Sequence, residues 1–150
     1  MDYVKYIREM VGHKPIILVG SVTILHKNNQ ILLQKRKGSA VLKWGLPGGL
    51  MEMGESAEET ARREIYEETQ LKVGTLNLVD VHSGSGSFIK VHNGDEFYSV
   101  SIAYETEDFN GILKIDKKES LDFKYFPFED LPKNMVGSHM TLIQSFLKKR

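Results

Sequence analysis

The spacing of hydrophobic and polar residues predicts that the first part of the chain contains a hairpin of two strands. Residues 16–25 are mostly apolar and β-branched, which is typical of a buried strand. Asn28 and Asn29 then form a polar pair that favours a turn into a second strand at residues 31–35. We therefore expect these two segments to pair before the chain reaches a glycine-rich loop.

Later segments repeat the strand pattern and add a helical one. Alternating apolar residues predict strands at 71–81, 96–105 and 123–128, with a flexible segment at 83–87 and turns at 91–96 and 129–131. Helical spacing occurs near the start (Val4, Ile7, Val11), at 57–69, and in an inward face near the end (Met140, Ile143, Phe146, Leu147). Ser138 is expected to cap the last helix. Strands mixed irregularly with helices indicate an α/β fold with a mixed sheet between helices.

The central helix carries acidic residues on its hydrophobic side. Ala57, Ala61 and Ile65 follow one another at intervals of four residues and form its only apolar stripe. Because successive residues are rotated by about 100° around a helix axis, Glu68 falls inside this stripe and Glu64 falls at its edge. Neighbouring carboxylates repel one another and are costly to bury, so the pattern favours a bound divalent cation over an ordinary solvated acidic face.

A rigid loop leads directly into this helix. Residues 44–49 read WGLPGG, in which the glycines allow the backbone to approach a ligand closely. Ser56 stands at the helix start with Glu59 three residues later, which is the spacing of a capping box. The helix is therefore expected to begin just after the loop. One flank of it then carries three acids at positions i, i+3 and i+4: Glu64, Glu67 and Glu68.

Together the loop and the helix resemble the signature of the Nudix hydrolases. That signature is a glycine, five residues, a glutamate, seven residues, Arg-Glu, an aliphatic residue, any residue, Glu-Glu, any residue, a glycine and an aliphatic residue. Within residues 49–71 it is matched by Gly49, Glu55, Arg63, Glu64, Ile65, Glu67, Glu68 and Leu71. The one departure is Gln70, where the family usually has a glycine that ends the helix in the left-handed conformation.

The resemblance implies an α/β/α sandwich with a mixed sheet, formed as one domain over residues 1–150. It also implies Mg²⁺-dependent hydrolysis of a pyrophosphate linkage in a nucleotide, with Mn²⁺ as a substitute for Mg²⁺. The implied metal ligands are Gly48, through its carbonyl, and Glu64, Glu67 and Glu68. Arg63 is implied to orient Glu55 or Glu64, and the backbone at Gly49 to lie against the substrate.

The general base and the cation that contacts the phosphates are assigned only as hypotheses, since each candidate residue could also be an ordinary surface residue. The general base is a glutamate of the signature, Glu64 or Glu67, or a carboxylate outside it, for which Glu119 is the candidate. Arg36, at the end of a predicted strand, is the candidate cation for the substrate phosphates. A solvent-exposed acid and an exposed strand-end arginine fit these two positions equally well.

Composition excludes several other functions. The 150 residues include 20 basic and 20 acidic residues, so the chain lacks the positive field that a nucleic-acid duplex partner requires. The absence of cysteine excludes disulfides, thiolate zinc sites and the cysteine chemistry of the isopentenyl diphosphate isomerases, which share the Nudix fold. The five histidines lack HExxH spacing and are expected to be structural or exposed. A charged start and short apolar runs indicate a cytoplasmic protein without a membrane partner, and a homodimer is compatible with the sequence.

The sequence does not specify one substrate. ADP-ribose, nucleotide sugars, dinucleoside polyphosphates and nucleoside triphosphates all fit the expected reaction, and the markers of the specialised subfamilies are missing. The alternative function is a nucleotide-binding or sensing module that keeps the fold without turnover. The complete set of Arg63, Glu64, Glu67 and Glu68 favours the enzyme, because a module without turnover has no need of a metal cluster.

Overall fold

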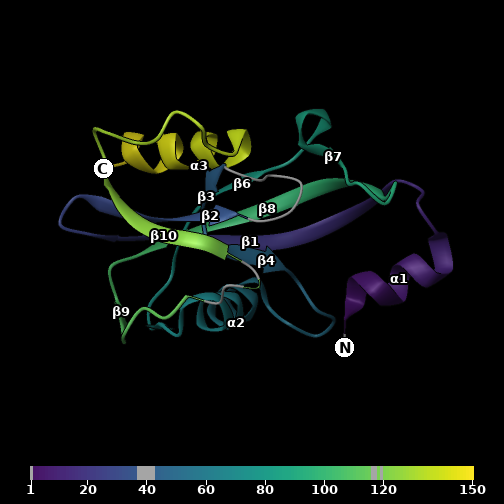
Figure 1. Ribbon diagram of the computed structural model, residues 1–150, viewed down its shortest axis with the longest axis horizontal. Helices are drawn as coiled ribbons and strands as arrows, with labels where there is room; N and C mark the ends of the chain where they lie inside the picture. Colours follow the sequence, from purple (N-terminus) through teal and green to yellow (C-terminus); the bar gives the residue numbers. More distant parts are fainter. Residues whose placement is uncertain (1, 37–42, 116–117, 119) are drawn as a thin grey trace.

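A mixed β-sheet with helices on both faces forms the centre of the molecule, which confirms the α/β architecture (Figure 1). The computed structural model describes residues 2–36, 43–115, 118 and 120–150. In chain order the elements are α1 (Tyr3–Val11), β1 (Ile16–Lys27), β2 (Gln30–Arg36), β3 (Trp44–Gly45), β4 (Gly48–Leu50), α2 (Ala57–Thr69), β5 (Lys72–Val73), β6 (Asn77–His82), the 3₁₀ helix η2 (Ser85–Ser87), β7 (Phe88–Lys90), β8 (Glu96–Thr106), β9 (Phe109–Asn110), β10 (Ser120–Pro127) and α3 (Gly137–Lys148).

The main sheet combines one parallel strand pair with antiparallel neighbours. Its strands follow the order β10, β2, β1, β8, β6, while β3 pairs with β2, β4 with β1 and β7 with β8. β1 and β8 run parallel, starting from Ile16 opposite Phe97. β1 and β2 form the expected hairpin, and its turn residues Asn28 and Asn29 have φ of 53° and 59°. Two left-handed residues are what a two-residue turn between twisted strands needs.

The two faces of the sheet bury separate hydrophobic clusters, because side chains alternate along each strand. Ile31 and Leu33 of β2 belong to the larger cluster, with Leu142 and Phe146 of α3. Leu32, between them, points to the opposite face and packs in the smaller cluster. That cluster also contains Ile65 of α2, Leu71, Phe109 and Phe123. Figure 1 shows α3 and α2 on opposite sides of the sheet, so the signature helix and the last helix are separated by the strands.

The segment 71–81 was expected to be one strand and is two. β5 pairs with β9 in a small two-stranded sheet, whereas β6 pairs with β8 in the main sheet. Between them, the Gly74 backbone N–H donates to the Asp108 carbonyl over 2.9 Å, and the Thr75 N–H donates to the Asp108 carboxylate over 2.8 Å. These contacts turn the chain from one sheet to the other.

One local expectation close to the candidate site is wrong. α3 begins at Gly137 with Val136 as its N-cap, and no side chain caps it. Ser138 is therefore the second helical residue and not the cap. The segment 83–87 contains η2, and Ser87 within it is buried.

Helix α1 lies at one end of the sheet, apart from the other helices (Figure 1). Its first backbone N–H, from Tyr3, donates to the Glu52 carboxylate over 2.7 Å, and Arg8 donates to the Glu96 carbonyl over 2.7 Å. These bonds tie the helix to the loop before α2 and to the start of β8. Among the described residues, no helix combines the length and the apolar character needed to cross a membrane.

Candidate functional site

Helix α2 carries the candidate site and starts and ends where its sequence predicts. Ser56 Oγ accepts from the Glu59 backbone N–H over 3.0 Å, and the Glu59 carboxylate accepts from the Ser56 N–H over 3.1 Å. The reciprocal pair is the expected capping box. At the other end, Gln70 adopts the left-handed conformation, with φ of 66°, in the place of the usual glycine. The helix is thus fixed at both ends.

The side of α2 that faces the sheet includes a carboxylate, as the periodicity predicts. Ala61 and Ile65 are fully buried, and Glu68 is only 5% exposed. Glu64 is half-buried at the edge of the same face. Glu67 differs from both, because its side chain is 57% exposed and points toward Arg63.

Arg63 connects the helix to the loop that precedes it. Its Nε lies 2.6 Å from Glu55 Oε2 and its Nη2 lies 2.9 Å from Glu55 Oε1, a bidentate pair. Its Nη1 donates to Glu64 Oε1 over 2.8 Å, and its Nη2 also donates to the Leu50 carbonyl over 3.0 Å. The hydrogen bond from Arg63, ahead of those from the Glu52 backbone N–H and other donors, lowers the pKa of Glu55 to about 2. Arg63 therefore holds the loop and Glu64 in fixed positions relative to each other.

Glu68 lies in an environment that opposes its negative charge. Its Oε1 accepts from the Gly48 backbone N–H over 3.0 Å. Burial, and then the negative charge of Glu64, raise the pKa of Glu68 to about 8, although Arg36 and hydrogen bonds from Gln34 and Gly48 act in the other direction. A buried carboxylate beside a second carboxylate needs a positive partner or a proton. The pair is therefore suited to a cation.

Gly49 brings its backbone against Glu64, so a side chain at position 49 would displace the Glu64 carboxyl group from its present position. A Cβ atom at position 49 would lie 2.3 Å from the carboxyl carbon of Glu64. The preceding Gly48 is similarly restricted, because its Cβ would lie 2.1 Å from the Ser21 carbonyl oxygen of β1. The two glycines of the WGLPGG loop thus let β4 pass between β1 and the helix acids.

Gly49→Ala is expected to destabilise the protein by about 1–3 kcal/mol, the usual cost of inserting a methyl group into a packed site. The free energy of unfolding in urea measures this effect. Gly86→Ala is the control, since a Cβ there meets no atom within 4 Å, and its stability should be unchanged or slightly higher. Equal stability of both variants would contradict the close contact with Glu64.

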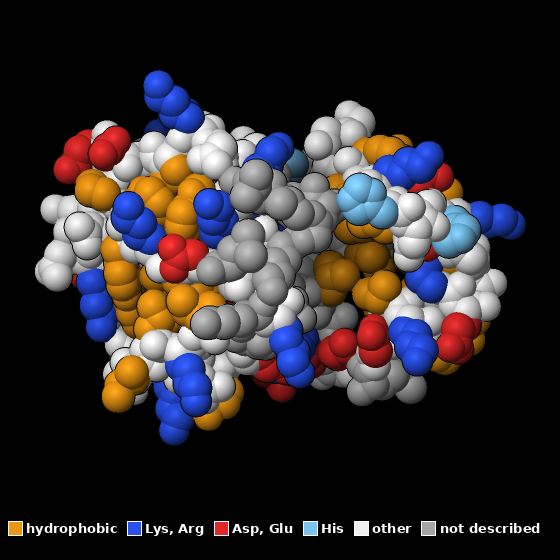
Figure 2. Space-filling view, in the orientation of Figure 1, with side chains coloured by type: hydrophobic (Ala, Val, Ile, Leu, Met, Phe, Trp, Pro, Cys, Tyr) orange, Lys and Arg blue, Asp and Glu red, His pale blue; other side chains and the backbone are white. Residues whose placement is uncertain are grey.

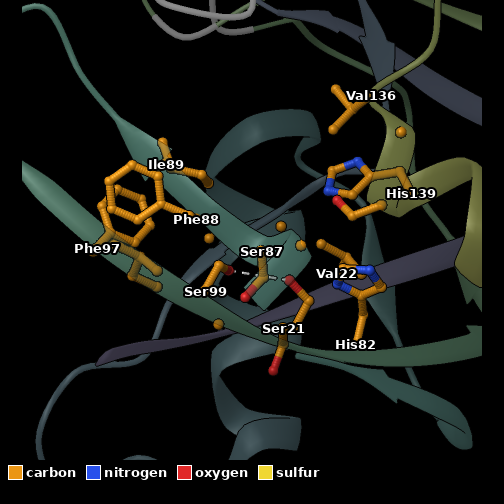
Figure 3. Close-up of a pocket in the computed structure, with 18 of the residues that line it drawn as sticks. Ser21, Val22, His82, Ser87, Phe88, Ile89, Phe97, Ser99, Val136 and His139 are labelled. Atoms are coloured by element: carbon orange, nitrogen blue, oxygen red, sulfur yellow. Dashed lines mark hydrogen bonds between the residues drawn. The ribbon is translucent and has the colours of Figure 1, made fainter. Parts of the chain in front are cut away.

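A pocket of about 510 Å³ opens on the other side of β4. Figure 3 shows its side chains coming from β1, β6, β7, β8 and α3. One wall is apolar and includes Phe88, Ile89 and Phe97, while His82, His139 and Arg36 contribute polar groups. In the space-filling view, hydrophobic side chains form the bottom of a hollow in this face, with charged side chains along one side of it (Figure 2). Gly48 and Gly49 line the pocket and contact the α2 carboxylates.

The structure brings most of the predicted site residues together. Glu64 and Glu68 of α2 contact the loop glycines, and Arg36 lines the pocket, where its Nη1 donates to the Leu46 carbonyl over 3.3 Å. Glu119 lies outside the described residues. Within the described part of the chain, no three or more His, Asp or Glu side chains form a group that could hold a metal ion alone. The predicted carboxylate set therefore needs backbone, water or substrate oxygens to complete a metal site.

Two buried residues near the site were not predicted. Gln34 of β2 is 2% exposed, its Nε2 donates to Ser120 Oγ, and its amide lowers the pKa of the nearby Glu68. His139 of α3 is 7% exposed and accepts the Leu46 N–H through Nδ1 over 2.9 Å. The polar Gln34 within the apolar strand ILLQK was the only available signal for the first of these residues.

Comparison with known proteins agrees with the signature. The family model for the NUDIX domain matches residues 15–146. The ADP-ribose pyrophosphatase of Methanocaldococcus jannaschii is 34% identical over 128 residues, which cover 83% of this chain and 70% of that protein. The 8-oxo-dGDP phosphatase NUDT18 of Homo sapiens is 30% identical over 118 residues, covering 77% of this chain and 33% of that protein. Across seven curated relatives other than the M. jannaschii protein, the match spans only 26% to 46% of the relative.

Solved structures show the same fold. The crystal structure of a MutT NUDIX hydrolase from Burkholderia pseudomallei superposes with a TM-score of 0.76 at 25% identity, covering 87% of this chain and 98% of that one. The family match spans most of the chain, and the signature residues lie together on α2 and the loop before it. The chain therefore belongs to the Nudix family.

Proposed function

We propose that this chain hydrolyses the pyrophosphate linkage of a nucleotide, with Mg²⁺ bound at Glu64 and Glu68. One observation carries the proposal: two neighbouring carboxylates, one of them buried, contact the Gly48–Gly49 backbone, and that backbone also lines a pocket large enough for a nucleotide. The site thus offers a position for a cation directly beside a position for a ligand. Those are the two components that phosphoryl transfer requires.

The donor set fits Mg²⁺, which prefers oxygen ligands and is usually held by one or two carboxylates together with substrate phosphates and water. Glu64 and Glu68 would hold the ion, with Glu67 beside them and the Gly48 carbonyl as a backbone ligand. Mn²⁺ would fit the same oxygens. When bound, the ion neutralises phosphate charge and makes a water molecule more acidic.

The chain's own residues would orient the metal ligands, contact the substrate phosphates and accept a proton. Arg63 holds Glu64 through its 2.8 Å bond, so that the carboxylate keeps its orientation while substrate binds. The positive charge of Arg36 acts to lower the pKa of Glu68. Arg36 would also contact the substrate phosphates. The proton of the attacking water passes to a carboxylate, either Glu64 or Glu67 of α2, or Glu119.

Relatives support a nucleotide as the substrate, since the M. jannaschii protein is named for ADP-ribose and the human protein for 8-oxo-dGDP. The competing function is a nucleotide-sensing module without turnover. It would need the pocket but not the Arg63 network or the buried Glu68.

A substrate panel tests the proposal. ADP-ribose, nucleotide sugars, dinucleoside polyphosphates and nucleoside triphosphates would be incubated with Mg²⁺ or Mn²⁺, and released phosphate and mononucleotide would be measured. We expect turnover of at least one class and its complete loss on chelation with EDTA. Tight nucleotide binding without hydrolysis of any member would favour the sensing module.

Gln34→Leu is expected to weaken Mg²⁺ or Mn²⁺ binding by about 10- to 100-fold, because groups that orient metal ligands typically have effects of this size. The amide of Gln34 favours the charged form of Glu68 from β2, and leucine fills a similar volume without a polar group. Mn²⁺ affinity measured by electron paramagnetic resonance gives the effect without relying on turnover. An unchanged affinity would show that Gln34 serves only to pack the sheet. Leu33→Met, on the opposite face of the same strand, is the control.

A further inference from the structure

His139 presents a fixed hydrogen-bond donor to the pocket. Its Nδ1 accepts the Leu46 N–H over 2.9 Å, so this nitrogen carries no proton. Burial, and then the positive charge of Arg36 and the charge of His82, lower the pKa of His139 to about 3, which keeps the ring neutral. A neutral ring with an unprotonated Nδ1 carries its proton on Nε2.

This Nε2–H group has no hydrogen-bond partner within the described residues, although the side chain is 93% buried, given its 7% exposure. Figure 3 shows the imidazole pointing into the pocket. The residues just before it, Gly137 and Ser138, also line the pocket, at the start of a 12-residue helix that no side chain caps. The first backbone N–H groups of a helix lack partners inside it. The pocket therefore offers several donors at one place.

The opposite wall of the pocket suits a flat ring. Phe88 and Phe97 lie together on that wall in Figure 3, facing the side of the pocket that carries Val136 and His139. Among the described lining residues there is no Asp, Glu, Asn or Gln side chain, and the polar side chains are those of serines, two histidines and Arg36. The aromatic and apolar wall suits the flat face of a nucleobase, and the donors on the His139 side favour a base edge that carries acceptors.

We propose that His139 selects a 6-oxopurine base by donating from Nε2 to its edge. This inference rests on the proposed function, since it assumes a nucleotide in the pocket. A 6-oxopurine presents two neighbouring acceptors, N7 and O6, whereas adenine presents N7 beside an amino donor. The paired acceptors match His139 and the first N–H groups of α3. An amino group at the O6 position would instead face the His139 donor, so these two groups would form no hydrogen bond with each other.

The test is metal-free binding in EDTA, which separates recognition of the base from turnover. Inosine 5′-monophosphate, adenosine 5′-monophosphate and purine riboside 5′-monophosphate differ at position 6 and, for inosine, in a proton on N1, and their dissociation constants would be measured by calorimetry. We expect inosine monophosphate to bind roughly tenfold or more tightly than the other two. Equal binding of the three, tighter binding of adenosine monophosphate, or no binding of any would overturn the inference.

His139→Ala is expected to reduce the preference to less than about twofold, whereas His92→Ala, at an exposed position outside the pocket, should retain it. If the preference survives in His139→Ala, His139 does not select the base. Because His139 also accepts the Leu46 N–H, nuclear magnetic resonance of the ¹⁵N-histidine-labelled wild-type protein provides a second measurement. Inosine monophosphate should shift the Nε2–H proton of His139 downfield, and an unmoved signal at saturation would overturn the inference.

The two proposals fail in different ways. Selective binding of inosine monophosphate without hydrolysis in the substrate panel would remove the enzymatic function and leave base selection by His139 in place. Metal-dependent hydrolysis that is equally fast for adenine and 6-oxopurine substrates would remove only the role of His139.

Discussion

Replacing Glu68 with Gln should lower kcat/KM for the best substrate by about 10²- to 10⁴-fold. The change keeps the size and shape of the side chain but removes the charge that would hold Mg²⁺. A metal ion contributes several kcal/mol to stabilisation of the transition state, and each 1.36 kcal/mol corresponds to a factor of ten in rate. The amide can still accept the Gly48 N–H, so the fold around the loop should persist.

Glu58→Gln is the matched control for this experiment. Glu58 lies on the same helix but is exposed in its first turn, and its removal should change kcat/KM by less than about twofold. Initial rates at several Mg²⁺ concentrations would distinguish weaker metal binding from slower chemistry. If Glu68→Gln retained wild-type activity at saturating Mg²⁺, Glu68 would not be a metal ligand.

The sequence predicts α2 well because the relevant interactions are local. The capping box joins residues three positions apart, and the burial of Ile65 and Glu68 follows from the helical period alone. The hairpin of β1 and β2 is predictable for the same reason, since Asn28 and Asn29 determine its turn. Each of these features depends on residues that are neighbours along the chain.

The residues that surround Glu64 and Glu68 could not be predicted from local sequence patterns. His139 meets the Leu46 N–H across 93 positions of sequence, and Gln34 meets Ser120 across 86. Neither pairing leaves a periodic signal, because each one depends on how the strands are ordered in the sheet. The parallel pairing of β1 with β8 has the same origin, and it places β8 and α3 at the pocket. The pocket is thus a tertiary feature, whereas the helix acids are a local one.

The environment of Glu68 should also make the metal-free protein less stable as pH rises. Its pKa is about 8 in the folded protein, against an ordinary value of 4.5. Between these two values the folded state binds more protons than the unfolded state, so the free energy of unfolding falls with increasing pH. This loss of folding stability is absent below about pH 4.5, grows between pH 4.5 and pH 8, and is complete above about pH 8. At 1.36 kcal/mol per pKa unit, it amounts to a few kcal/mol.

Glu68→Gln removes this titration, so the variant that loses activity should gain stability. In EDTA, its free energy of unfolding should exceed that of the wild type by an amount that grows from pH 5 to pH 8 and approaches a few kcal/mol. Urea unfolding followed by circular dichroism at each pH measures the difference. Saturating Mg²⁺ should stabilise the wild type at pH 8 and leave Glu68→Gln almost unchanged, because a ligand stabilises only the state that binds it. A difference that is independent of pH would mean that Glu68 does not retain a proton in the folded metal-free protein, and that its charge is balanced within the protein itself.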